Sequence, residues 1–299
     1  MRSLKAMAQT DGLLLLVAII WGFAFVAQRN GMEAIGPFAF GAARFALGAL
    51  SLIPLLILQR KREARKGVPS PRLSFRQRSL WALGAGTVLF VAASLQQVGL
   101  VHTTAGNAGF ITCLYVVLVP LAGRFLGRPA GFHIWLGAGL ALGGLYILSI
   151  GTGLKLAPGD SLELLGAFFW TLHILIIAHV GARIDTLELS IGQFATCATL
   201  SFFAALAREP HAFRGLPAAG LPILYGGLLS VGVAYTLQIV AQRRAHPAHA
   251  SIILSMEALF AAVGGVLLLH EPLSLRLILG GGLMLAGMAA SQLAPKKAA

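Results

Sequence analysis

Ten apolar stretches of roughly twenty residues, joined by short polar connections, run through nearly the whole of this 299-residue chain. A hydrocarbon core about 30 Å thick is crossed by roughly 20 apolar helical residues, so each stretch is long enough to span a membrane. The stretches cover approximately 11–28, 37–59, 79–101, 105–126, 131–150, 160–180, 189–207, 216–240, 248–269 and 273–293.

Composition excludes a single water-soluble core. Apolar residues make up 57% of the chain and charged residues 11%, whereas an ordinary soluble domain carries about 25% charged residues. Backbone amides in lipid must be satisfied within their own segment, and no stretch alternates apolar and polar residues as a barrel strand does. The predicted fold class is therefore an all-α membrane protein with ten transmembrane helices and no separate soluble domain.

The positions of the basic residues predict the orientation. Counted in alternate connections, 17 of the 23 Lys and Arg residues fall on one side, 5 fall on the other, and Arg44 lies inside the second stretch. Cytoplasmic loops are enriched in Lys and Arg, so we expect both termini in the cytoplasm. Binding of anionic lipid or nucleic acid by the basic loop 60–78 is the alternative; we expect no nucleic-acid partner.

The first stretch follows Arg2 and Lys5 as a signal peptide would, but it continues from Leu13 to Ala27 without a clear cleavage site. We expect it to be a retained first helix. Cys113 and Cys197 lie inside apolar stretches, where buried small residues are expected rather than a disulfide or a metal site. Phosphate-loop, zinc-protease and nucleophile-elbow motifs are absent, so we expect no enzyme and no cofactor.

The two halves of the chain resemble each other. Residues 137–144 and 280–287, both rich in glycine, are identical at five of eight positions. At an offset of 142, Leu95-Gln96 matches Leu237-Gln238, and Trp21 matches Trp170 at a slightly larger offset. We predict two five-helix repeats, 1–150 and 160–293. Because five is odd, the second must be inverted in the membrane, as in transporters that alternate access to a midplane site.

These patterns resemble the EamA repeats of the drug/metabolite transporter superfamily. The resemblance rests on Ile20-Trp21-Gly22, on Ala42 to Phe45, on Ala250 to Phe260 and on His270 to Leu273, and it covers nearly the whole chain. It is closest to the bacterial YddG-type amino-acid exporters. Two departures concern loop contacts and the bend of the ninth helix: Arg128-Pro129 stands where the family often carries an acidic residue, and Ala258 where proline is common.

Glu257 is the clearest candidate for a functional residue, since it lies near the middle of the ninth stretch. A charge at the centre of a membrane helix costs about 2.5–3.5 kcal/mol on insertion scales. Glu257 can bind a substrate ammonium, take up a proton for coupling, or bond to a neighbouring helix. Its counterpart by the repeat offset is Tyr115. His173 is a second candidate for proton coupling, and downhill efflux is equally compatible with the sequence.

Helical spacing groups further polar and aromatic residues on facing helices. For each of them an interhelical hydrogen bond, worth about 0.6 kcal/mol on average, is the structural alternative. Arg44 is expected near the membrane rim, as an anchor or in a salt bridge, and Gly139 and Gly143 in a packing scaffold or dimer face. The candidate substrate-binding residues are Trp21, Phe25, Gln28, Ser94, Gln97, Asn107, Tyr115, Trp170, His173, Tyr235, Thr236, His249 and Glu257.

The resemblance implies a bacterial inner-membrane transporter that exports amino acids, aromatic and other neutral ones included, or similar small metabolites by alternating access through a central cavity. The expected partners are a small-molecule substrate and the lipid bilayer, with the chain acting as monomer or homodimer. The alternatives are a transporter of nucleotide sugars or lipophilic drugs on the same fold and a channel-like facilitator.

Overall fold

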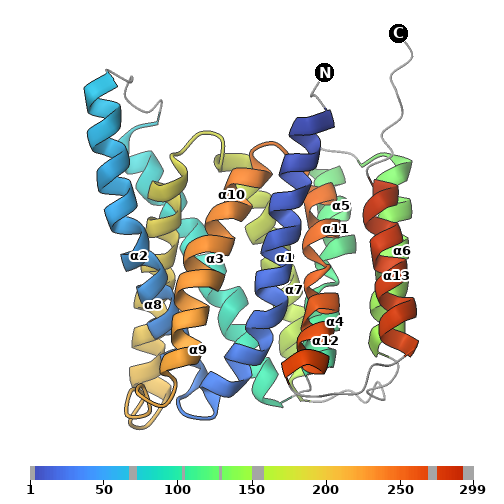
Figure 1. Ribbon diagram of the computed structural model, residues 1–299. Coiled ribbons are helices and arrows are strands. Elements are labelled where there is room, and N and C mark those ends of the chain that lie inside the picture. The colour runs from blue at the N-terminus through green and yellow to red at the C-terminus, as the bar shows by residue number, and fades with distance from the viewer. Residues whose placement is uncertain are drawn as a thin grey trace.

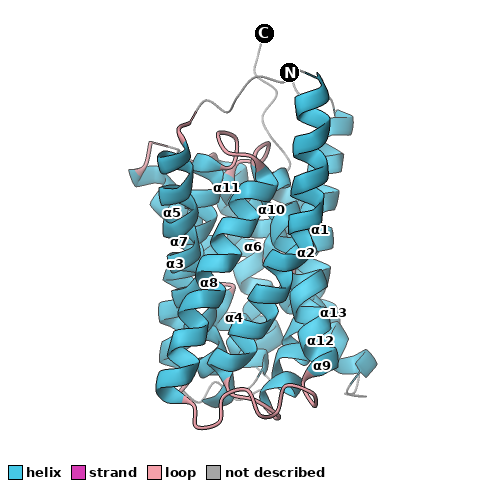
Figure 2. Ribbon diagram, turned by 90° about the vertical axis from the view of Figure 1, so that its left-hand side faces the viewer, coloured by secondary structure: helices cyan, strands magenta, loops and turns pink. Residues whose placement is uncertain are grey.

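The computed structural model describes residues 4–66, 73–102, 105–127, 130–149, 158–268 and 275–291. All regular elements in these ranges are helices, and they stand side by side in one bundle (Figures 1 and 2). In chain order they are α1 (Leu4–Met32), α2 (Pro37–Lys66), α3 (Phe75–His102), α4 (Ala105–Thr112), α5 (Tyr115–Phe125), α6 (Phe132–Ser149), α7 (Asp160–Val180), α8 (Thr186–Arg208), α9 (Gly220–Leu224), η2 (Tyr225–Tyr235), α10 (Thr236–Gln242), α11 (Pro247–Leu254), α12 (Glu257–Leu268) and α13 (Leu275–Ser291).

Within the described ranges, 7 helical segments are long and apolar enough to cross a membrane. Shorter apolar helices cover Tyr115–Phe125, Phe132–Ile147 and Ile278–Ser291. The all-helical membrane class predicted from the sequence agrees with this arrangement. The number of ten crossings and the inversion of the two halves remain predictions.

Two of the predicted helices are broken in the middle, where the sequence analysis expected continuous ones. The stretch 105–126 divides into α4 and α5 at Cys113 and Leu114, and the stretch 248–269 divides into α11 and α12 at Ser255 and Met256. The two breaks lie 142 positions apart, which is the offset of the repeat. Neither break contains proline or glycine, the residues that commonly interrupt helices. The hydrophobic pattern of the two stretches also continues through the breaks and does not predict them.

The stretch 216–240 also departs from a plain α-helix. Its central part, η2, winds as a π-helix between α9 and α10. Wider turns of this kind are frequent at functional sites. Here the wider winding accompanies two contacts with α1: Trp21 Nε1 donates to the carbonyl of Ser230 at 3.2 Å, and the Tyr225 hydroxyl donates to the carbonyl of Ile20 at 2.9 Å.

Charged contacts tie helices together at one end of the bundle. Glu188, near the start of α8, pairs with Arg60 of α2 at 2.8 Å and also with Arg78 of α3. At the same end, His249 of α11 joins Asp11 of α1, at 2.9 Å, to Ser291 of α13, also at 2.9 Å (Figure 1). The beginning of α1 and the end of α13 are therefore linked through His249.

At the opposite end a carboxylate closes the beginning of α2. Glu209, directly after α8, accepts hydrogen bonds from the backbone N–H groups of Phe38 at 2.7 Å and Ala39 at 2.9 Å. Helix N-termini leave N–H groups without intrahelical partners and favour negative charge. The Glu209 carboxylate accepts from these N–H groups and carries a negative charge. It thereby holds the connection between α1 and α2 against the end of α8.

The α6 and α13 helices form a close seam at one edge of the bundle (Figure 1). A Cβ atom added at Gly144 would meet the carbonyl oxygen of Gly280 at 2.5 Å, and one at Gly137 would meet that of Gly287 at 2.7 Å. The glycines thus allow direct backbone contact between helices of the two halves. Gly139, which the sequence analysis placed in the scaffold, has no neighbour within 4 Å of its Cβ position.

Candidate functional site

A cavity with about 500 Å³ of empty space, counted with its part open to solvent, lies between helices of both halves of the chain. Its walls are mostly aromatic and amide side chains, with one arginine and one glutamate. It is lined by Trp21, Phe25, Gln28, Arg44, Gln96, Thr112, Tyr115, Trp170, Ile174, Ser230, Tyr235, Gln238, Leu254 and Glu257.

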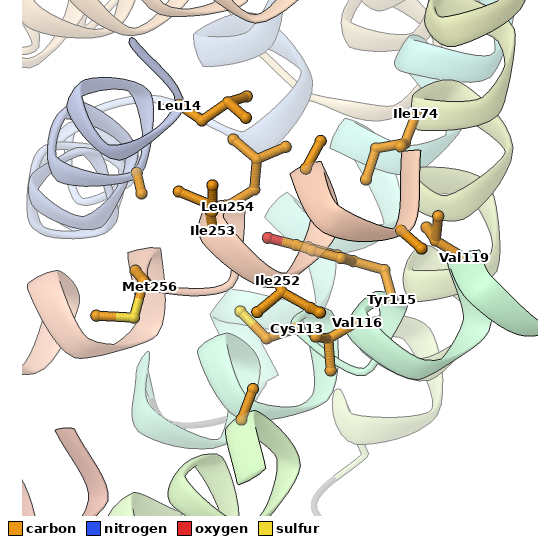
Figure 3. Packing of buried hydrophobic residues seen from close by; sticks show 14 of the residues in the cluster. Leu14, Cys113, Tyr115, Val116, Val119, Ile174, Ile252, Ile253, Leu254 and Met256 are labelled. Atoms are coloured by element: carbon orange, nitrogen blue, oxygen red, sulfur yellow. The ribbon is translucent and has the colours of Figure 1, made fainter. Parts of the chain in front are cut away.

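The breaks of the two interrupted helices meet at this cavity. The Tyr115 hydroxyl, at the start of α5, donates a hydrogen bond to Glu257 Oε1, at the start of α12, at 2.9 Å. The Cys113 thiol lies 3.6 Å from both the carbonyl oxygen of Ser255 and Glu257 Oε1. Figure 3 shows Tyr115 reaching from its own helix toward the α11 segment that carries Ile253 and Leu254.

Aromatic rings from three helices enclose the opposite part of the cavity. Tyr235, at the end of η2, lies 4.6 Å from the Trp21 ring of α1 and 6.4 Å from the Trp170 ring of α7, measured between centroids. The Trp170 and Tyr235 rings stack at 22°. Such rings offer apolar faces that can enclose the side chain of a small ligand.

The lining residues come in pairs related by the sequence repeat. At an offset of 142, both members line the cavity in the pairs Gln96 and Gln238, Thr112 and Leu254, and Tyr115 and Glu257; at an offset of 149 the same holds for Trp21 and Trp170 and for Phe25 and Ile174. The cavity is thus built from equivalent positions of the two halves.

Arg44 lies inside this cavity and not at the membrane rim, where the sequence analysis expected it. The residue is only 4% exposed. Its guanidinium stands over the Phe45 ring at 4.8 Å and near the Phe40 ring at 5.7 Å. Among the described residues no carboxylate pairs with it, so the expected salt bridge is also not formed there.

Seven of the predicted site residues line the cavity together: Trp21, Phe25, Gln28, Tyr115, Trp170, Tyr235 and Glu257. Asn107 belongs to α4, but its side chain lies outside the described part of the structure.

Three other predicted residues do not line the cavity, and two of them bond to neighbouring helices. Gln97 donates to the sulfur of Met32 at 3.3 Å, and the Thr236 hydroxyl donates to Ser190 Oγ at 3.2 Å. Ser94 is half-buried on α3 and does not line the cavity. Adjacent helical residues differ by about 100° in direction, so Gln96 faces the cavity while Gln97 faces α1.

The two predicted histidines also lie outside the lining. His173 is fully buried behind the aromatic wall, with Nε2 3.0 Å from Gln193 Oε1 and its ring edge-on to Tyr235. His249 lies at the end of the bundle between Asp11 and Ser291. Both have structural partners that a repeat comparison does not reveal.

The sequence analysis missed seven lining residues: Arg44, Gln96, Thr112, Ile174, Ser230, Gln238 and Leu254. The repeat itself carried the signal for most of them. Gln96 and Gln238 are identical at the repeat offset, and Ile174 and Leu254 are the partners of other lining residues. Ser230 has no such signal, because it reaches the cavity through the winding of η2.

The arrangement is suited to binding a polar ligand. Among the described residues, no three His, Cys, Asp or Glu side chains cluster closely enough to coordinate a metal ion. Several buried polar atoms at the cavity lack a hydrogen-bond partner, namely Gln28 Oε1, Arg44 Nε, Trp170 Nε1 and Gln238 Oε1. Buried polar groups are normally satisfied, so these atoms are unpaired polar positions in the wall of the cavity.

Comparisons with known proteins agree with this architecture. A model of the EamA-like transporter family matches residues 9–150 and 157–291. An "Uncharacterized transporter" of Archaeoglobus fulgidus is 31% identical over 87% of this chain and 78% of its own length. The "Uncharacterized inner membrane transporter YedA" of Escherichia coli K12 is 24% identical over 88% of this chain and 84% of its own length.

A solved structure described only as "Crystal structure of protein" shares the fold, with a TM-score of 0.78, 20% sequence identity and coverage of 96% of this chain and 97% of that one. The helical bundle, its membrane-spanning segments and the two matched repeats are consistent with a multi-pass membrane transporter. The chain belongs to the EamA-like transporter family.

Proposed function

We propose that this transporter exports amino acids, neutral and aromatic ones included, across a bacterial inner membrane by alternating access. The repeats 1–150 and 160–293 act as two inverted five-helix halves, which together give ten crossings. The cavity between them opens alternately to either side as one half rocks against the other. Both termini lie in the cytoplasm.

One observation carries this proposal: two interrupted helices, one from each half, meet beside the cavity through Tyr115 and Glu257. Secondary transporters bind substrate where discontinuous helices of two repeats meet near the membrane midplane. A break also lets each helix bend as the halves move. The separate matches of the family model to 9–150 and 157–291 support the assignment of one repeat to each half.

The cavity chemistry supports a small amphipathic substrate with an amino group. The Glu257 carboxylate accepts one hydrogen bond from Tyr115 and retains further lone pairs for an ammonium group. The neighbouring rings of Trp21, Trp170 and Tyr235 offer apolar faces to an apolar side chain. Amide groups of Gln96 and Gln238 face the same space and can hold polar parts of the substrate.

The basic residues support the proposed orientation. Arg60, Arg78 and Arg243 lie at the same end of the bundle as the beginning of α1, where Arg243 donates to the carbonyl groups of Gly181 and Ile184. An excess of Lys and Arg marks the cytoplasmic side. The end that contains Asp11 and Ser291 is therefore assigned to the cytoplasm.

Counterflow in proteoliposomes tests the function. Vesicles are preloaded with unlabelled threonine, methionine and phenylalanine, and the entry of each labelled amino acid is followed. We expect saturable entry that unlabelled amino acids inhibit. Entry without saturation or counterflow would indicate a channel. Protein that is folded but carries none of the three amino acids would contradict amino-acid export, and nucleotide sugars and lipophilic drugs would then be tested.

Glu257→Gln examines the carboxylate directly. We expect counterflow to fall by about tenfold or more, because the ammonium group loses its charged partner, while the glutamine oxygen still accepts from Tyr115. Glu33→Gln, at an exposed position, is the matched control and leaves transport unchanged. If Glu257→Gln changes neither the rate nor its dependence on an imposed pH gradient, Glu257 neither binds the substrate nor couples a proton.

A further inference from the structure

Arg44 is a buried cation without an anionic partner among the described residues. It is 4% exposed, its Nε atom has no hydrogen-bond partner, and none of the ion pairs within the described part of the chain includes it. Burying an unpaired charge is costly. A position that keeps such a charge beside a cavity points to a ligand that supplies the missing anion.

The surroundings hold the guanidinium in place without neutralising it. The Phe45 ring lies 4.8 Å and the Phe40 ring 5.7 Å from its central carbon, and cation–π contacts of this kind attract the group but leave its N–H donors free. Gly226 of η2 lies against the methylene stem, since a Cβ there would meet Arg44 Cδ at 3.5 Å. The side chain is thus packed on several sides while its head remains at the cavity.

The cavity lining holds one basic and one acidic side chain, Arg44 and Glu257. They form no ion pair with each other, and both line the same cavity as Tyr235. A lining that carries one positive and one negative group, held apart in the same space, is complementary to a ligand with one negative and one positive group.

We propose that Arg44 binds the α-carboxylate of the transported amino acid, while Glu257 faces its ammonium group. This inference rests on the proposed function and specifies its substrate class as zwitterionic. Guanidinium presents two parallel N–H donors that match the two carboxylate oxygens. A nucleotide sugar would bring its phosphates toward Glu257, and a lipophilic cation would meet Arg44; the pair disfavours both.

The test compares each amino acid with an analogue that lacks only the carboxylate. Counterflow of labelled phenylalanine, methionine and threonine by the wild-type protein is measured at increasing concentrations of an inhibitor. The inhibitor is either the unlabelled amino acid or its amino alcohol. We expect the amino alcohols to require a concentration about tenfold higher or more, because a site built to bind a polar group rejects analogues without it. Equal inhibition by the alcohols would overturn the carboxylate site and leave amino-acid transport intact.

Variants of Arg44 then test whether this residue causes the preference for the amino acid over its amino alcohol. Arg44→Gln is expected to reduce counterflow about tenfold or more and to remove the preference for the amino acid over its alcohol. Arg44→Lys keeps the charge but not the two-pronged geometry, so an intermediate preference is expected. Arg29→Gln, at an exposed position at the end of α1, is the matched control.

A variant with reduced counterflow but an unchanged preference for the amino acid would show that Arg44 does not hold the carboxylate. If Arg44→Gln does not fold, the wild-type series with its amino alcohols still decides whether a carboxylate is required, and Arg44→Lys decides the residue. A wild-type protein that carries none of the three amino acids would refute the proposed function and this inference with it.

Discussion

The junction of the broken helices and the seam between α6 and α13 are both built from matching positions of the two halves, yet they differ in almost every physical respect. At the junction, polar side chains meet across a cavity, with Tyr115 bonded to Glu257. At the seam, backbone meets backbone because Gly144 and Gly280 carry no side chain. The same duplication thus yields a polar contact beside a cavity and a direct backbone contact without one.

A substitution in the seam between α6 and α13 is expected to have the largest effect on stability. In Gly144→Ala the new Cβ would lie 2.5 Å from the carbonyl oxygen of Gly280, and a helix backbone cannot yield as a flexible side chain would. Overpacking costs about 1–3 kcal/mol, which corresponds to a fall in Tm of roughly 5 °C. Thermal unfolding of the purified protein in detergent measures it, and counterflow should fall in proportion to the loss of folded protein.

Gly139→Ala provides the comparison on the same helix. No atom lies within 4 Å of its Cβ position, so its Tm is expected to stay within about 1 °C of the wild-type value or rise slightly, because alanine favours the helix. Equal destabilisation by both substitutions would show that helix composition, and not contact with α13, determines the stability of this region.

Tyr115→Phe, at the junction, is expected to reduce transport beyond its effect on stability, which distinguishes the junction from the seam. Removing the hydroxyl leaves the buried Glu257 carboxylate with only the weaker Cys113 thiol as a donor, at 3.6 Å, at a cost of about 1–3 kcal/mol, and we expect counterflow to fall several-fold beyond the loss of folded protein. Tyr225→Phe removes a comparable hydrogen bond, from the Tyr225 hydroxyl to the carbonyl of Ile20 at 2.9 Å, at a position outside the cavity lining. It should lower stability but leave the KM of counterflow unchanged.

A double-mutant cycle sharpens this result. If Tyr115 acts through Glu257, the combined variant with Glu257→Gln should lose little more transport than Glu257→Gln alone. Additive losses would mean that the two residues act independently, and the junction would then be two separate contacts instead of one unit.

The smallest expected effect distinguishes two neighbouring amides. Gln96 lines the cavity, whereas Gln97 donates to Met32 Sδ at 3.3 Å. We expect Gln96→Ala to raise the KM of counterflow about threefold to tenfold, the effect of one hydrogen bond of about 1 kcal/mol, and Gln97→Ala to leave it unchanged. A larger effect at Gln97 would mean that α3 presents its other face to the substrate.

Most of the helices could be predicted from hydropathy alone, because the length of an apolar stretch directly reports the thickness of a bilayer. The breaks could not. Cys113 and Leu114 are ordinary residues for a helix interior, and so are Ser255 and Met256. The carbonyl of Ser255 accepts from the N–H of Ala258 at 3.2 Å, and the Cys113 thiol contacts the same oxygen from across the junction. The thiol contact is a tertiary one, and no local pattern encodes it.

The candidate site was predictable where the repeat and the helical face pointed to the same residue, as for Trp21 and Trp170. Arg44 shows where this reasoning fails. The position of Arg44 along its helix would allow a long side chain to reach the membrane rim. In the structure the side chain lines the cavity instead. Gln96 was marked by its match to Gln238, while polarity alone could not distinguish it from Gln97.

The bond between His249 and Asp11, residues 238 positions apart in the chain, has a consequence for biosynthesis. At about 5–20 residues per second, a ribosome needs roughly 10–50 s to make the chain between these two helices. During that time α1 lies in the membrane without its contact to α11. Because Ser291 of α13 bonds to the other nitrogen of His249, the contact between His249 and Asp11 gains its last partner only when α13 has been made.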